Sequence, residues 1–87
     1  MQTSSAAIAL LEQAQKTSKD AAQVIENLIA QHDYQDVALI ITHAAAELLE
    51  TAKLLMYSQD VAAFESLERA EDLLDSFYDI VDGEIDE

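Results

Sequence analysis

The side chains best placed to do chemistry in this chain are a histidine and two glutamates near its middle. His43, Glu47 and Glu50 are spaced four and three residues apart, so a helix would place all three on one face. Imidazole nitrogen and carboxylate oxygen are both ligands of divalent metals. The usual helical metal motifs are missing, because the other histidine lies eleven residues away and isoleucine stands three residues before each histidine, where a di-iron bundle needs glutamate. We therefore interpret His43 as a surface residue beside acids and predict no bound metal and no cofactor.

The segment from Ala44 to Val81, "AAAELLETAKLL…LERAEDLLDSFYDIV", resembles the two central helices of the all-α nucleoside-triphosphate pyrophosphohydrolases of the MazG and phosphoribosyl-ATP pyrophosphohydrolase type. Glu47 and Glu50 match the first Glu-x-x-Glu pair of that family, and Asp72 fits its second carboxylate pair. The resemblance implies a magnesium site at these three residues, where a water would be polarised against a phosphate chain. Arg69 stands where the family has its fourth carboxylate, and the resemblance covers less than half of the chain. A metal-dependent enzyme of this class is the alternative function.

Other catalytic chemistry has no support in the sequence. The chain has no cysteine, and no serine or threonine neighbours a helical His–Asp pair. One glycine in the whole chain excludes a glycine-rich phosphate loop. We predict that the protein is not an enzyme.

A run of acidic residues towards the end of the sequence is the strongest signal for binding. Six of these residues recur at spacings of 3, 4, 3, 4 and 3, and we call them the acidic stripe: Glu65, Glu68, Asp72, Asp75, Asp79 and Asp82. With Leu67 and Leu74 at heptad position a, the stripe falls at positions b and f, which are farthest from a core. Like charges at this spacing cost an isolated helix about 0.2–0.5 kcal/mol per pair. A basic surface on a partner would relieve that repulsion.

The negative charge is concentrated in the last third of the chain. Residues 58–87 hold eleven acids against Arg69, a net charge of −10, whereas the first 57 residues contribute −4 of the total of −14. This balance disfavours binding to nucleic acid or to anionic membranes, whose phosphates would be repelled. We predict an interaction module of the inhibitor, adaptor or chaperone type, which docks a basic surface of a partner protein and could compete with nucleic acid for it. A solvated face without a partner, or a metal site, are the competing interpretations of the stripe.

Three repeats of apolar residues at helical spacing predict three long helices. The expected helices span about 5–31, 34–57 and 60–82, and an acidic tail occupies 83–87. Asp33 is a candidate N-cap of the second helix, Ser58 or Asp60 of the third, and Gly83 is a candidate left-handed stop. Matched lengths and short connections predict an all-α antiparallel bundle of three long helices that forms one domain over residues 1–87.

The second helix has more apolar residues than one face can hold, so we expect it to lie in the middle of the bundle. An excess that remains exposed would mark an interface. We predict that the chain forms a homo-oligomer, pairing into a larger bundle through three residues of this helix: Leu39, Leu49 and Met56. Packing of all these residues within one chain, or against a helix of another protein, are the other possibilities.

Composition limits the setting of the protein. Glu12 interrupts the first apolar run, which lacks a basic region before it, and no run approaches the roughly 20 apolar residues that span a bilayer. With no cysteine to form disulfides, we expect a soluble cytoplasmic protein without a membrane partner.

Overall fold

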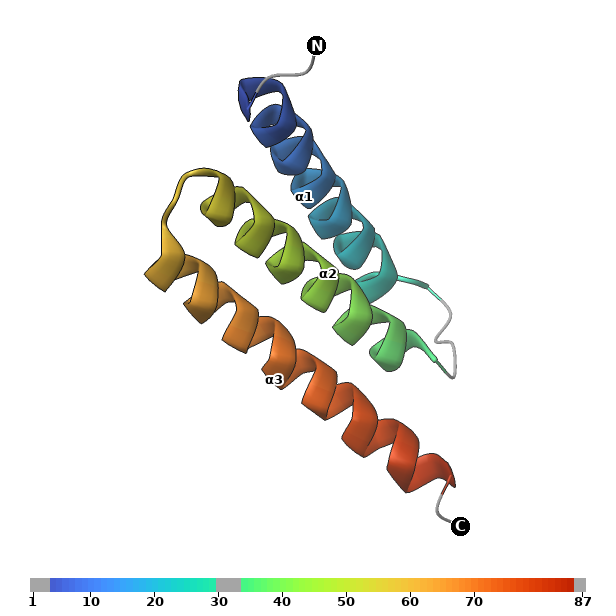
Figure 1. Cartoon of the computed structure of the whole chain (residues 1–87). Helices are drawn as coiled ribbons and strands as arrows, with labels where there is room; N and C mark the ends of the chain where they lie inside the picture. Colours follow the sequence, from blue (N-terminus) through green and yellow to red (C-terminus); the bar gives the residue numbers. More distant parts are fainter. Residues whose placement is uncertain (1–3, 30–33, 86–87) are drawn as a thin grey trace.

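The computed structural model describes residues 4–29 and 34–85, and within them the chain forms three helices and no strand (Figure 1). Helix α1 spans Ser4–Glu26, α2 spans Gln35–Met56 and α3 spans Asp60–Ile85. The predicted all-α antiparallel bundle of three long helices is confirmed. None of these helices, over the described residues, has an apolar stretch long enough to cross a bilayer.

Helix α2 lies between the other two helices, as its excess of apolar residues predicts. It packs against both α1 and α3, whereas α1 and α3 make no contact with each other in the described part of the chain (Figure 1). The three helices therefore form an open layer rather than a closed triangle. Its radius of gyration is 15.2 Å, compared with about 12 Å for a compact domain of this length.

The apolar residues that are fully buried between the helices are small. They are all alanines: Ala22, Ala44, Ala46, Ala63 and Ala70. Gln15, Thr51 and Ser66 are the buried polar residues. Alanine and serine let helix backbones approach closely, but each buries little apolar area. Among the described residues no leucine, isoleucine, valine or phenylalanine is fully buried, so the layer lacks a core of large side chains.

Helix α1 ends at Glu26, five residues before the predicted end at residue 31. The side chain of Asn27 donates to the Gln23 carbonyl at 2.8 Å, and asparagine disfavours the helix because its side chain competes for backbone groups in this way. The Gln35 side chain, from the start of α2, donates to the Ile25 carbonyl at 2.7 Å. This bond satisfies a carbonyl of the last turn and ties the two helices together. The predicted cap Asp33 lies outside the described residues.

The turn between α2 and α3 is a Schellman motif in which Ser58 takes the position usually held by glycine. Its φ angle is 58°, in the left-handed region. The Gln59 N–H donates to the Leu54 carbonyl at 2.9 Å, and the Ser58 N–H donates to the Leu55 carbonyl at 3.0 Å. Ser58 therefore ends α2 and does not cap α3, while Asp60 is the first residue of α3 and lies in its first turn. The prediction of either residue as N-cap is wrong.

Gly83 does not stop α3, which continues to Ile85. Its φ angle is not positive, and a Cβ placed on it would meet no atom within 4 Å. The predicted left-handed stop is therefore wrong. Residues 83–85, expected in a tail, belong to the helix.

Candidate interaction surfaces

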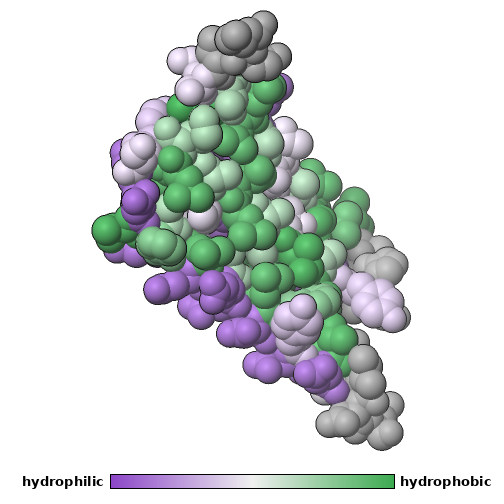
Figure 2. Space-filling model, viewed as in Figure 1, coloured by the Kyte–Doolittle hydropathy of each residue, from purple (hydrophilic) through white to green (hydrophobic). Residues whose placement is uncertain are grey.

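The acidic stripe lies along the outer edge of α3. All six of its residues are exposed. Helix α3 faces α2 through Ala63, Ser66 and Ala70, which are buried, and the helical repeat places the stripe on the opposite side of α3. Figure 2 shows this hydrophilic edge as a purple band along α3.

No ion pair among the described residues includes a member of the stripe. The ion pairs that they form are Lys16–Asp20, Lys53–Glu50 and Arg69–Glu47. Arg69 is the one cation in the sequence of α3, and its Nε lies 3.1 Å from Oε2 of Glu47 on α2. The positive charge nearest to the stripe along the chain is therefore directed inward, towards α2.

A network of polar groups joins α2 to α3 beside this ion pair. Ser66 is fully buried, and its hydroxyl lies 2.8 Å from the Glu47 carbonyl and 3.2 Å from the Glu47 carboxylate. The hydroxyl of Thr51 lies 3.0 Å from that of Ser66 and 2.9 Å from the same carbonyl. Glu47 is thus fixed by Arg69 on its exposed side and by Ser66 on its buried side.

A second carboxylate joins α2 to α1. The buried side chain of Gln15 donates to Oε2 of Glu50, and Nζ of Lys53 lies 3.2 Å from the same oxygen. The hydrogen bond from Gln15 is the main reason that the pKa of Glu50 lies below its ordinary value, while burial opposes this shift and Lys53 adds to it. Glu50 is therefore held in its charged form at the contact between α1 and α2.

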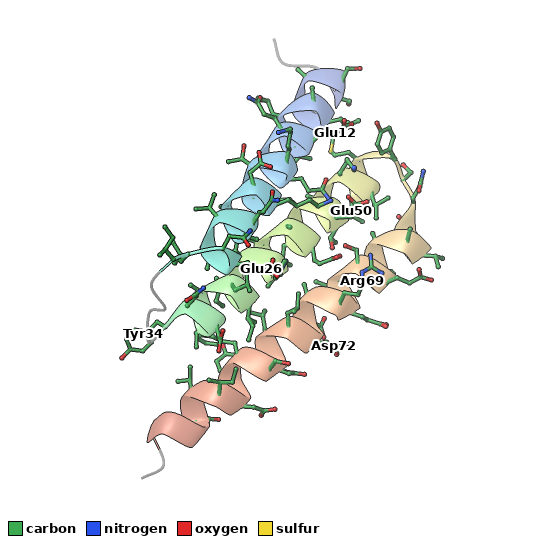
Figure 3. All side chains as sticks on the ribbon, turned by 180° about the vertical axis from the view of Figure 1, so that it is seen from behind. Glu12, Glu26, Tyr34, Glu50, Arg69 and Asp72 are labelled. Carbon is green, nitrogen blue, oxygen red and sulfur yellow. The ribbon has the colours of Figure 1, made fainter. Side chains whose placement is uncertain are left out.

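The structure does not bring together the alternative metal set of Glu47, Glu50 and Asp72. Glu47 is directed to α3 and Glu50 to α1, and Figure 3 shows Glu50 and Asp72 on separate helices. Glu47 and Asp72 line one hollow, but Arg69 lines it with them. Within the part of the chain that the structure describes, no group of three or more histidines or acids is positioned to hold a metal ion.

The lysines gather away from the stripe. All three lysines of the chain, Lys16, Lys19 and Lys53, line one hollow with Glu12 and Gln15, on α1 and α2. Lys16 is paired with Asp20 and Lys53 with Glu50. The three lysines are thus separated from α3, and the molecule is electrically polarised across its width.

One side of the layer is apolar over all three helices. Its largest members are exposed or half-buried, and we call them the apolar face: Leu10 and Val24 of α1, Ile41, Leu48 and Leu55 of α2, and Phe64, Leu67, Leu74 and Tyr78 of α3. Figure 2 shows hydrophobic surface extending over this side. Figure 3 views the other side, where Glu12, Glu50 and Arg69 are labelled. The two sides of the layer therefore differ in chemistry.

The three residues predicted for self-association are not among the large members of the apolar face. Leu39 lies four residues before His43, so the helical repeat places it on the opposite side of α2. Met56 is 43% exposed, whereas Leu39 and Leu49 are half-buried. By comparison, Ile41, Leu48 and Leu55 of the same helix are 40%, 44% and 53% exposed. Their spacing with the alanines at 38, 45 and 52 is 3, 4, 3, 4 and 3, so a signal for a second seam was present in the sequence.

Comparison of the chain with protein-family models, with curated proteins and with solved structures finds no match.

Proposed function

We propose that this protein is an acidic helical interaction module that docks a basic surface of a partner protein through the acidic stripe. The observation that supports this proposal is that all six carboxylates of the stripe are exposed and none takes part in an ion pair of the described residues. Repulsion between neighbours of the stripe is therefore left uncompensated within the chain. A cationic partner would lower the free energy of the helix as it binds.

The shape of the stripe suits a basic groove. From Glu65 to Asp82 it extends about 26 Å along α3, and its charges recur about every 5–6 Å. A regular line of negative charge on a convex helix can occupy a groove lined with lysine and arginine, and it speeds association at low salt. Competition with nucleic acid for such a groove is the form of inhibition that we propose.

The distribution of cations favours the α3 edge as the docking site. The three lysines lie on α1 and α2, where they would repel a basic partner. The partner would therefore approach from the α3 side of the layer. We also propose that the protein is cytoplasmic, as expected from the sequence.

The test compares two variants with equal net charge. Asp72, Asp75 and Asp79 are changed to asparagine in the first, and Glu12→Gln, Glu26→Gln and Asp36→Asn are combined in the second. Partner proteins are first captured at low and at high salt. The Kd of each captured partner for each variant is then measured by calorimetry over a series of salt concentrations. We expect the stripe variant to bind more weakly and with a flatter salt dependence than the control variant. Equal weakening by both variants would show that total charge matters and the stripe does not.

The alternative function, a metal-dependent nucleoside-triphosphate pyrophosphohydrolase, is favoured by the match of Glu47 and Glu50 to the first motif of that family. Its test is the release of pyrophosphate from nucleoside triphosphates in Mg²⁺, compared between the native chain and Glu47→Gln. Release that is abolished by this substitution would replace the docking proposal. Its absence from the native chain would remove the alternative.

A further inference from the structure

The apolar face leaves large side chains in solvent while small ones fill the interior. Leu10, Val24 and Phe64 are 61%, 64% and 62% exposed. In a closed three-helix bundle, Ile41 and Leu48 would point into the space between the helices, but here they are 40% and 44% exposed because α1 and α3 lie on either side of α2 without meeting. The residues best able to form a core thus lie on one open side of the layer.

The exposed area exceeds that of a monomer of this size. The chain exposes 6324 Å² for a mass of 9.6 kDa, whereas compact monomers of that mass expose about 5,100 Å². The excess is about 1,200 Å², and a stable interface buries about 800 Å² on each partner. One contact of ordinary size on the apolar face would account for about two-thirds of the difference.

The centre of the face is self-complementary. Along α2 the face presents Ile41, Leu48 and Leu55 in alternation with Ala38, Ala45 and Ala52, and none of these six residues is charged. Such alternation of large and small residues lets the side chains of one helix fit between those of an identical helix. The acidic stripe lies at the outer edge of α3, away from this seam, so two chains of charge −14 can meet here with least repulsion.

We propose that a second copy of this chain covers the apolar face, with α2 packed against α2 at the centre of a symmetric dimer. The flanks of α1 and α3 complete the contact, and the combined six helices enclose the leucines and isoleucines that the single layer leaves open. Because the same patch serves both copies, the interface is closed and limits assembly to two chains. The stripes stay free on the outside, so the dimer would present two docking edges.

Sedimentation equilibrium of the full chain over a range of concentrations tests the proposal. We expect a dimer, and we expect Leu48→Glu to raise its dissociation constant on the order of 100-fold or more, because each copy would bury an unpaired carboxylate. Val61→Glu is the matched control, since Val61 is 74% exposed and the helical repeat places it on the outer side of α3, where we expect little change. A native chain that stays monomeric at every concentration would overturn the proposal, as would equal effects of the two substitutions.

Crosslinking keeps the proposal testable if Leu48→Glu disturbs folding. The chain has no cysteine, so single cysteines can be placed at Ala45 on the apolar face and at His43 on the opposite side of α2. Ala45 lies near the middle of α2, so two copies bring this position close together in a parallel or an antiparallel pairing. A short bismaleimide should join Ala45→Cys chains into dimers and leave His43→Cys chains unjoined. The reverse result would place the contact on the polar side. Neither experiment depends on the stripe, so failure here is separate from failure of the docking function.

Discussion

The Nε–H of Arg69 donates to Oε2 of Glu47 at 3.1 Å, and this contact joins the third helix to the second. The Arg69 side chain is 54% exposed and that of Glu47 is 30% exposed, so the pair contributes little to stability, about 0–1 kcal/mol. Its larger effect is on charge. The one cation of α3 is directed towards α2, and the outer edge of the helix is left entirely negative along the stripe.

The buried hydroxyl of Ser66 should stabilise the contact between α2 and α3. Ser66→Ala removes its hydrogen bonds to Glu47, worth about 1 kcal/mol, but replaces serine with a better helix former, which returns about 0.5 kcal/mol. Ser76→Ala is the matched control, because its hydroxyl bonds the Asp72 carbonyl within the same helix. We expect Ser66→Ala to be less stable than Ser76→Ala by about 1 kcal/mol in urea unfolding. Equal stability of the two variants would mean that the network between the helices is not formed in solution.

The left-handed conformation of Ser58 should be replaceable by glycine with a gain in stability. A residue with a Cβ pays about 1 kcal/mol in this conformation, and glycine does not. We expect Ser58→Gly to raise the free energy of unfolding by up to about 1 kcal/mol. Gln59→Gly, one residue later, should lower the free energy of unfolding. Ser58 is the only non-glycine residue of the described structure with a positive φ, so glycine at position 59 relieves no strain. A loss of stability in Ser58→Gly would contradict the Schellman turn.

The charged form of Glu50 should stabilise the fold in a pH-dependent way. Its pKa in the folded chain is lowered below the ordinary value of 4.5, mainly by the hydrogen bond from Gln15. The stabilisation is therefore present above pH 4.5 and is lost as the pH falls through the lower folded pKa. The stability difference between the native chain and Glu50→Gln should shrink over that acidic range.

Total stability at each pH would combine the contribution of Glu50 with those of other groups in the chain. The difference between native chain and variant, measured by urea unfolding at each pH, isolates Glu50. Gln15→Ala should reduce the same pH-dependent difference, because it removes the main cause of the shift. A difference that stays constant with pH would show that Glu50 keeps its ordinary pKa.

Neutralising part of the stripe should stabilise the isolated chain at low salt. Asparagine at positions 72, 75 and 79 removes four neighbouring like-charge pairs, so we expect a gain of about 1–2 kcal/mol. The gain should fade as salt is raised, because exposed charges are screened. Unfolding of this variant and of the control variant at Glu12, Glu26 and Asp36 can be compared at low and high salt. A loss of stability would show that these carboxylates of the stripe also take part in stabilising contacts.

The spacing of apolar residues was enough to predict the three helices, their antiparallel order and the central place of α2. It could do so because apolar residues at helical spacing define one face of each helix and short connections force neighbouring helices to run in opposite directions. The positions of the stripe relative to Leu67 and Leu74 also followed from that spacing. Helix ends followed less well, because single side chains decide them: Asn27 competes for a backbone carbonyl and Ser58 adopts a left-handed turn.

Which face of each helix is buried and which is exposed could not be predicted before the helices were seen packed together. Spacing gives the direction of an apolar face about its own helix axis, but it does not say where a neighbouring helix lies around that axis. With α1 and α3 on opposite sides of α2, small residues such as Ala44 and Ser66 became the interior. Leu48 became surface for the same reason. The contacts of Arg69 with Glu47 and of Gln15 with Glu50 join residues 22 and 35 positions apart, and a contact across such a distance exists only once the helices have packed.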